Sequence, residues 1–83
     1  MSPVHLRRIH AERNMRRFYA LDVRPNLFGH WAFIREWGRV GSSGHVMTLL
    51  FPTAREAYAA LEHRQRAKVR RGYIQTLRAK EGS

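Results

Sequence analysis

Apolar and polar residues alternate along much of residues 4–51, which is the pattern of half-buried β-strands. In residues 17–23 the alternation is clear, because Tyr19, Leu21 and Val23 fall on one face. Residues 31–37 are rich in aromatic and β-branched side chains, which favour strands. Residues 46–51 are apolar on both faces, so we expect a central, well-covered strand there. Including a weaker alternation near the start, the strands predicted are 4–10, 17–23, 31–37 and 46–51.

Short polar segments separate these strands. Residues 12–14 are polar and predict a turn. Pro25 fixes its own φ and Asn26 tolerates unusual backbone angles, so residues 24–26 predict a second turn. Residues 41–44 read Gly-Ser-Ser-Gly and predict a hairpin loop.

After residue 51 the hydrophobic period changes from that of a strand to that of a helix. Thr53 and Glu56 have the spacing of a capping box, in which each residue satisfies a backbone amide of the other. An apolar stripe at helical spacing follows, and Gly72 is a suitable C-cap. We therefore predict a helix over about 53–71 and an α+β fold, with the amphipathic first half of the helix lying on the sheet.

The charge balance favours a polyanionic partner. The 83 residues hold 16 Lys and Arg against six Asp and Glu, a net charge of +10. Lys68 and Lys80 are the only lysines, and arginine suits bidentate phosphate recognition. An arginine-rich proteome would raise arginine over lysine, but would not by itself suppress the acidic residues.

Basic residues are concentrated in the last two turns of the predicted helix. They are Arg64, Arg66, Lys68, Arg70 and Arg71. The helix dipole accounts for two or three cations near a C-terminus. Five cations repel one another unless an anion or a neighbouring acid relieves them, so we interpret this end as half of a phosphate-binding surface. A merely solvated helix face is the alternative.

Several classes of function find no support in the sequence. The chain has no cysteine, which excludes disulfides, a thiolate zinc site and a cysteine nucleophile. The five histidines match no metal-ligand spacing, and Ser42 and Ser43 lack a convincing base and acid. We expect no metal, no cofactor and no enzymatic activity. With no signal-peptide pattern in residues 1–10 and no apolar run near the ~18 residues of a membrane span, we expect a cytoplasmic, nucleoid-associated protein.

The segment Trp37-Gly38-Arg39-Val40-Gly41 lies where a strand is predicted to end. A flat ring can stack on a base or sugar, and a neighbouring guanidinium can bind a phosphate. The glycines permit unusual backbone geometry or close approach.

Each of these side chains also has a purely structural interpretation. Trp37 could lie in the core, although its position favours exposure. Arg39 could form a salt bridge with Glu36 or Asp22. For Trp31 we expect packing in the middle of the sheet and no ligand role.

On these residues the chain resembles WGR domains, named for this tripeptide and found in DNA-dependent poly(ADP-ribose) polymerases and in small bacterial proteins. The aromatic pair Phe18-Tyr19 matches an early strand of the family, and Lys68 followed by Gly72-Tyr73 resembles its basic-glycine-tyrosine ending. The resemblance covers about residues 16–73.

The resemblance implies a small twisted antiparallel β-sheet with one long helix packed across it, and DNA binding near strand breaks. It places Trp37 against a sugar or base, Arg39 on the backbone or a partner domain, and Tyr73 near a 5′-phosphate. Eukaryotic relatives often carry asparagine two residues before the aromatic pair, where this chain has Arg16. End recognition therefore does not follow from the resemblance alone.

We expect a single domain over 1–83, with a core of about 14–73, a tail of 74–83 and no room for a catalytic transferase domain. The predicted function is non-catalytic binding of double-stranded DNA with low sequence specificity, with ends or nicks as candidate targets. RNA binding and binding of an acidic protein are the alternatives. A monomer or a weak dimer through an edge strand such as 4–9 is expected. The candidate nucleic-acid-binding residues are Arg16, Trp37, Gly38, Arg39, Lys68, Arg70, Arg71 and Tyr73.

Overall fold

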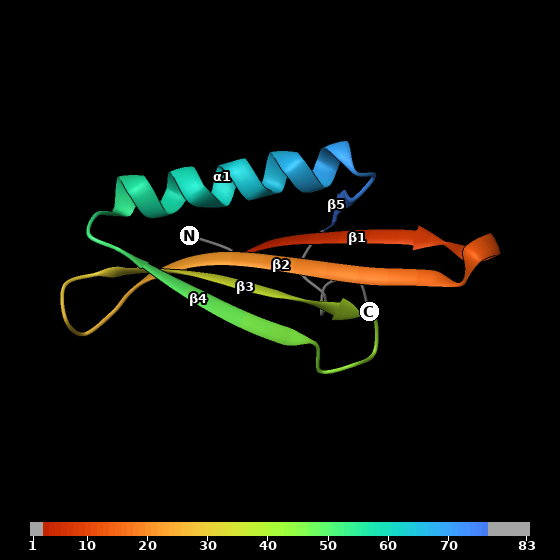
Figure 1. Cartoon of the computed structure of the whole chain (residues 1–83), viewed down its shortest axis with the longest axis horizontal. Helices are drawn as coiled ribbons and strands as arrows, with labels where there is room; N and C mark the ends of the chain where they lie inside the picture. The colour runs from red at the N-terminus through yellow and green to blue at the C-terminus, as the bar shows by residue number, and fades with distance from the viewer. Residues whose placement is uncertain (1–2, 77–83) are drawn as a thin grey trace.

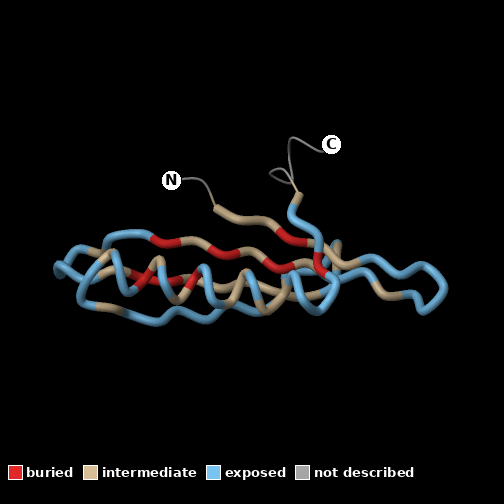
Figure 2. Tube along the Cα trace, turned by 90° about the horizontal axis from the view of Figure 1, so that it is seen from above, coloured by how far each residue is buried: buried red, intermediate tan, exposed pale blue. Residues whose placement is uncertain are grey.

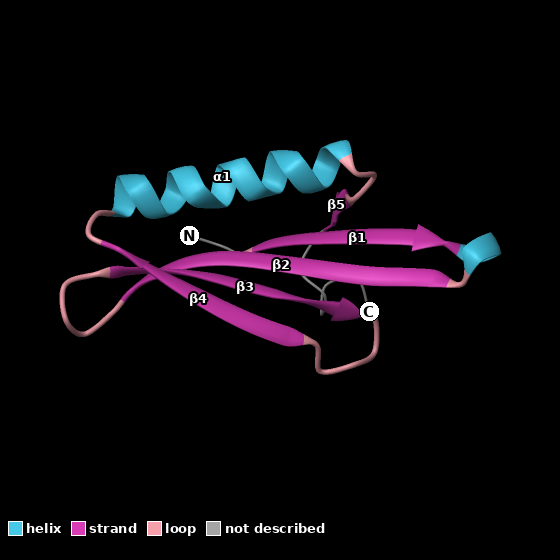
Figure 3. Cartoon of the chain, in the orientation of Figure 1, coloured by secondary structure: helices cyan, strands magenta, loops and turns pink. Residues whose placement is uncertain are grey.

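The computed structural model describes residues 3–76, which form a five-stranded sheet with one long helix across one face (Figure 1). The helix α1 spans Ala54–Arg70, and a short 3-10 helix, η1 (Ala11–Arg13), joins the first two strands. Neighbouring strands are antiparallel, in the order β4-β3-β2-β1-β5 (Figure 3). The strands are β1 (Val4–His10), β2 (Met15–Pro25), β3 (Trp31–Arg39), β4 (His45–Phe51) and β5 (Ile74–Thr76). The predicted α+β class is confirmed.

The hydrophobic core lies between the sheet and α1. On β2, Tyr19, Leu21 and Val23 are buried, as their alternation predicts, and the residues between them are less buried. Figure 2 shows buried positions alternating with less buried ones along the chain. Cross-strand pairing aligns this row with its neighbours, because Leu6 lies opposite Tyr19. The full set of buried side chains in the cluster is Leu6, Tyr19, Leu21, Val23, Phe33, Ala57, Leu61 and Tyr73.

Both ends of α1 have the caps that the sequence predicts, with one difference at the N-terminus. The Thr53 side chain accepts from the Glu56 amide at 3.2 Å. The Glu56 carboxylate accepts from the Thr53 hydroxyl at 3.1 Å, whereas in the predicted capping box it would accept from the Thr53 backbone amide. At the C-terminus the Tyr73 amide donates to Lys68 and the Gly72 amide to Val69, each at 3.0 Å, which is a Schellman motif.

The folded core is wider than the 14–73 expected. β1 lies inside the sheet and supplies Leu6, and β5 pairs with β1 over His5–Arg7. The pairing with β5 also means that β1 is not an edge strand over His5–Arg7, so the expected dimer edge at residues 4–9 is not open over these three residues. Residues 77–83 of the predicted tail lie outside the described residues.

The prediction that residues 46–51 form a central strand is also wrong. β4 lies at the edge of the sheet and pairs only with β3 in the described part of the chain. Four of its apolar side chains are substantially exposed: Val46 (62%), Met47 (44%), Leu49 (43%) and Leu50 (59%). An apolar strand can lie in the centre of a sheet or at its edge, so the composition of residues 46–51 alone does not determine its position in the sheet.

Candidate nucleic-acid interface

A concave pocket of about 500 Å³ is lined by residues near the ends of β3 and α1. Both of these ends lie at the same end of the sheet (Figure 1). We call this pocket the basic pocket. Its walls come from the start of β2, the end of β3, the start of β4 and the last turns of α1. The lining residues are Arg13, Asn14, Met15, Arg16, Arg17, Phe18, Tyr19, Trp37, Gly38, Arg39, His45, Lys68 and Tyr73. Among these described residues there are five cations and no carboxylate.

A row of aromatic rings crosses the floor of the basic pocket. Strand register sets this row, because Tyr19 lies opposite Trp37 and Trp37 lies opposite His45. The Tyr19 and Trp37 rings stack with centroids 5.9 Å apart and an interplanar angle of 16°. The Trp37 and His45 centroids are 5.8 Å apart. Trp37 is therefore half-buried against the core, and not freely exposed as expected.

A row of arginines lies beside the aromatic row on the same face of the sheet. Arg17 is opposite Arg8 on β1 and opposite Arg39 on β3. Like charges directly opposite each other on neighbouring strands are destabilising. The one ion pair in residues 3–76 is elsewhere, between Arg24 and Asp22, so no carboxylate in this part of the chain relieves the row.

Lys68 reaches this site from the last turn of α1. Its ammonium lies 4.5 Å from the centroid of the Tyr19 ring and 5.4 Å from that of Tyr73. The pKa of Lys68 is lowered from its usual 10.5, first by burial and then by repulsion from neighbouring guanidiniums. Those arginines, in decreasing order of effect, are Arg71, Arg64, Arg35 and Arg17. A bound anion would act in the opposite direction, because it favours the charged ammonium.

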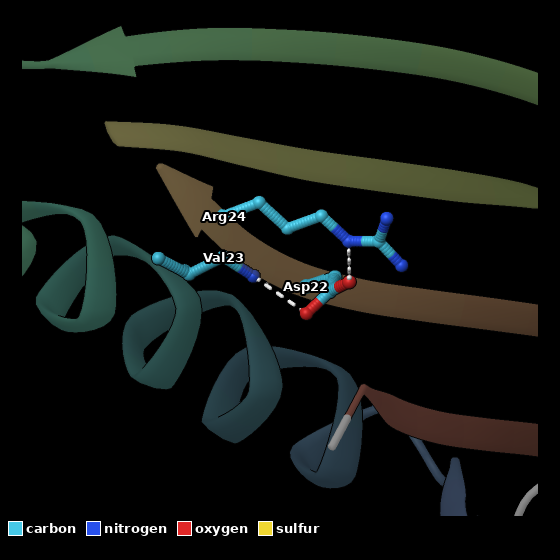
Figure 4. Close-up of polar contacts among 3 residues, drawn as sticks. All are labelled: Asp22, Val23 and Arg24. Atoms are coloured by element: carbon cyan, nitrogen blue, oxygen red, sulfur yellow. Dashed lines mark hydrogen bonds and ion pairs between the residues drawn. The ribbon is translucent and has the colours of Figure 1, made fainter. Parts of the chain in front are cut away.

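Arg39 makes neither of the salt bridges considered from the sequence. Its guanidinium donates to the Asn14 backbone carbonyl at 3.3 Å and to the Asn14 side-chain oxygen at 3.2 Å. Asp22 instead accepts from the Val23 amide and from Arg24 (Figure 4). Asn14 has a positive φ of 52°, so these bonds hold the turn between η1 and β2 against Arg39. Both of the Asn14 oxygens that Arg39 contacts are neutral, so the positive charge of Arg39 remains available to a ligand.

Gly38 and Gly44 allow the β3–β4 hairpin to close behind Trp37. A Cβ on Gly38 would lie 2.8 Å from the Gly44 Cα. A Cβ on Gly44 would lie 2.6 Å from the Trp37 carbonyl oxygen and 2.9 Å from the Phe18 ring. Gly38 therefore serves a close approach of two chain segments, as the sequence predicts for this position.

We expect Gly44→Ala to destabilise the fold by about 2–4 kcal/mol, because the new methyl group meets backbone and the φ of +72° is strained for alanine. Gly41→Ala is the matched control: its φ is +93° and nothing lies within 4 Å of its Cβ. Urea unfolding of both variants gives the comparison. Equal losses of stability would show that backbone strain accounts for the whole effect and that the close approach contributes nothing.

The structure brings six of the eight candidate residues together in the basic pocket: Arg16, Trp37, Gly38, Arg39, Lys68 and Tyr73. Arg70 and Arg71 do not line it. Arg70 borders a separate shallow hollow on α1. The charge of Arg71 lowers the pKa of Lys68, which lines the pocket.

Sequence reasoning missed Arg13, Arg17, Tyr19 and His45 as pocket residues. The signal for Arg17 was present, because strand alternation puts it on the same face as Tyr19. His45 becomes recognisable only once the β3–β4 register is known.

Residues 3–76 hold neither a cluster of metal ligands nor a membrane-spanning helix. They contain no group of three or more His, Asp or Glu placed to hold a metal ion. No helix within them is both long and apolar enough to cross a membrane.

A family model described as the WGR domain matches residues 2–80. The chain is also 37% identical over 70 residues to "Uncharacterized protein y4dW" from Sinorhizobium fredii (strain NBRC 101917 / NGR234). The match covers 84% of this chain but 34% of that protein, so the chain spans about a third of its relative. No solved structure matches the chain significantly. The chain belongs to the WGR family, whose domains are non-catalytic nucleic-acid-binding modules.

Proposed function

We propose that this domain binds double-stranded DNA through the basic pocket, with little dependence on base sequence. One observation carries the proposal: an arginine row lies directly beside an aromatic row on one face of the sheet, with no carboxylate among the pocket residues. Cations at regular spacing suit the phosphates of a backbone, and the aromatic edge suits a sugar or base. Such contacts do not distinguish one base pair from another.

In this proposal seven of the eight candidate residues make a contact with the DNA. Arg16, Arg39 and Lys68 bind phosphates in the pocket, and Arg70 and Arg71 make weaker, peripheral phosphate contacts from the flank of α1. Trp37 packs on a sugar or base with the part of its ring that Tyr19 leaves open. The Tyr73 ring is buried beside Lys68, and Tyr73 lines the basic pocket. In the proposal its hydroxyl donates a hydrogen bond to the phosphate that Lys68 binds.

Salt dependence tests the electrostatic part of the proposal. If about four to six phosphates are neutralised, affinity for duplex DNA falls about 10²–10³-fold between about 50 and 200 mM salt. Fluorescence anisotropy with a labelled duplex measures the slope. An affinity that hardly changes over this range would contradict phosphate binding as the main source of affinity.

A binding panel tests the preferred nucleic acid. We expect stronger binding to nicked and blunt duplexes than to closed circular DNA, and Trp37→Ala to weaken binding to ends more than to closed circles. An equal loss of affinity for DNA ends and for closed circles would show that Trp37 does not recognise DNA ends. Duplex RNA and single strands enter as competitors, and 5′-phosphorylated and 5′-hydroxyl ends are compared directly. If duplex RNA or single strands compete better than duplex DNA, the proposed preference for double-stranded DNA is wrong.

The lowered pKa of Lys68 predicts how binding depends on pH. A bound phosphate favours the charged ammonium and raises this pKa, so binding takes up protons wherever free Lys68 has lost part of its charge. Affinity should therefore fall as the pH rises through the lowered pKa of Lys68. Lys68→Arg should remove the fall, because a guanidinium keeps its charge. If the affinity of Lys68→Arg for DNA falls at the same alkaline pH, a titratable group other than Lys68 causes the fall.

A further inference from the structure

β4 presents an open backbone edge along its whole length. It is a seven-residue strand, and in the described part of the chain its only sheet partner is β3. An unpaired edge of this kind is a template for another strand, since its outward amides and carbonyls lack partners in the sheet.

The side chains of β4 do not protect that edge. Soluble proteins commonly blunt an edge with lysine, proline, a bulge or an inward-pointing charge. Residues 45–51 read His-Val-Met-Thr-Leu-Leu-Phe, with no Lys, Arg, Asp, Glu or Pro. Val46 and Leu50 are 62% and 59% exposed, although the rest of this basic chain is rich in charge. An apolar, uncharged strand is the partner that such an edge accepts.

We propose that β4 pairs antiparallel with β4 of a second copy of this chain, about a twofold axis at Thr48. In that register Val46 of one copy lies opposite Leu50 of the other, and Met47 lies opposite Leu49. Apolar pairs of similar size then meet on both faces, and Thr48 meets Thr48 at the centre. Side-chain pairs directly opposite each other on neighbouring strands are the contacts that stabilise a sheet.

The sequence of β4 favours a second copy over an unrelated strand because it is nearly symmetric about Thr48. No ionised side chain of β4 meets its own counterpart across the axis. The two copies carry +10 each, but at physiological salt their more distant charges are screened beyond about 8 Å. Dimerisation should therefore strengthen as salt is raised, which is the opposite of nucleic-acid binding.

The twofold axis is perpendicular to the sheet, because Thr48 of both copies lies on the same face. The two five-stranded sheets become one continuous sheet, with both α1 helices and both basic pockets on one side. A single strand pair buries less than the about 1,200 Å² of a standard interface, so we expect a weak, concentration-dependent dimer.

Sedimentation equilibrium of the nucleic-acid-free protein at several concentrations tests the proposal independently of its DNA-binding function. We expect a reversible dimer that Val46→Lys reduces at least tenfold in association constant. Val46 lies opposite Glu36 on β3, so a lysine there retains a favourable neighbour and the monomer stays folded. Leu27→Lys adds the same charge at a loop residue that is 97% exposed, and should leave the dimer unchanged. A monomer at all concentrations, or equal effects of the two variants, would overturn the proposal.

Cross-linking tests the register. The chain has no cysteine, so Thr48→Cys supplies a single thiol. Residues directly opposite in an antiparallel pair have Cα atoms about 4.5–5.5 Å apart, which is within reach of a disulfide. Mild oxidation should convert Thr48→Cys to a covalent dimer much faster than Leu27→Cys. Equal rates would overturn the pairing centred on Thr48.

Discussion

Lys68→Met is expected to lower the affinity for a short DNA duplex by about 10–150-fold, the value of a charged hydrogen bond of about 1.5–3 kcal/mol. Lys68 is the cation that α1 brings to the basic pocket, where burial and neighbouring guanidiniums lower its pKa. A phosphate therefore gains more from Lys68 than from a freely solvated side chain. The slope of log affinity against log salt should also fall by about 0.9 for the lost phosphate contact.

The substitution should leave the fold intact. Losing the cation–π contacts with Tyr19 and Tyr73 costs about 0.5–1 kcal/mol, and relief of repulsion from the nearby arginines acts in the other direction. Methionine keeps the length and packing of the stem. Urea unfolding should therefore show a change within about 1 kcal/mol.

Arg70→Met is the matched control for Lys68→Met. It removes one charge from the same turn of α1, but Arg70 lies outside the basic pocket. We expect a loss of affinity of less than about fivefold, as for a peripheral charge of at most about 1 kcal/mol. Equal losses in the two variants would mean that net charge, and not the pocket, determines affinity.

Leu21→Ala is expected to have the largest effect on stability, about 2–5 kcal/mol. Leu21 is fully buried at 0% exposure, in the middle of β2 and beneath α1. An 83-residue chain has a total stability of about 4–12 kcal/mol by its length, so the variant approaches the limit of folding. The melting temperature should fall by about 4–8 °C for each kcal/mol.

Leu27→Ala provides the comparison for Leu21→Ala. It removes the same atoms from a side chain that is 97% exposed, so the change should stay within about 0.5 kcal/mol. Thermal unfolding followed by circular dichroism measures both variants. A loss at Leu21 as small as that at Leu27 would contradict its place in the core.

Local patterns predicted the elements well. The alternation of Tyr19, Leu21 and Val23 identified both a strand and its buried face. Thr53 and Gly72 marked the ends of the helix to within one or two residues, because caps depend on neighbouring backbone groups. β5 was not predicted, since three residues are too few to show a period.

The predictions for β4 and Trp37 were wrong, and the partner of Arg39 was missed, because the environment of each depends on residues that are distant in the chain. β4 and a covered central strand share the same apolar composition, and only the order of strands shows that β4 is at the edge. Trp37 was expected to be exposed because it is flanked by glycine, but its register opposite Tyr19 stacks the two rings. The Arg39 partner is Asn14, which is 25 residues away in sequence.

The sequence by itself determined four of the five strands, the helix and its caps, the positive charge and the family, because each depends on nearby residues or on simple counts. The tertiary structure alone decided that Arg8, Arg17 and Arg39 form a row beside the Tyr19–Trp37 stack. It also decided that Lys68 reaches this site and that β4 is left open. These features depend on strand register and helix placement, which join residues far apart in the chain.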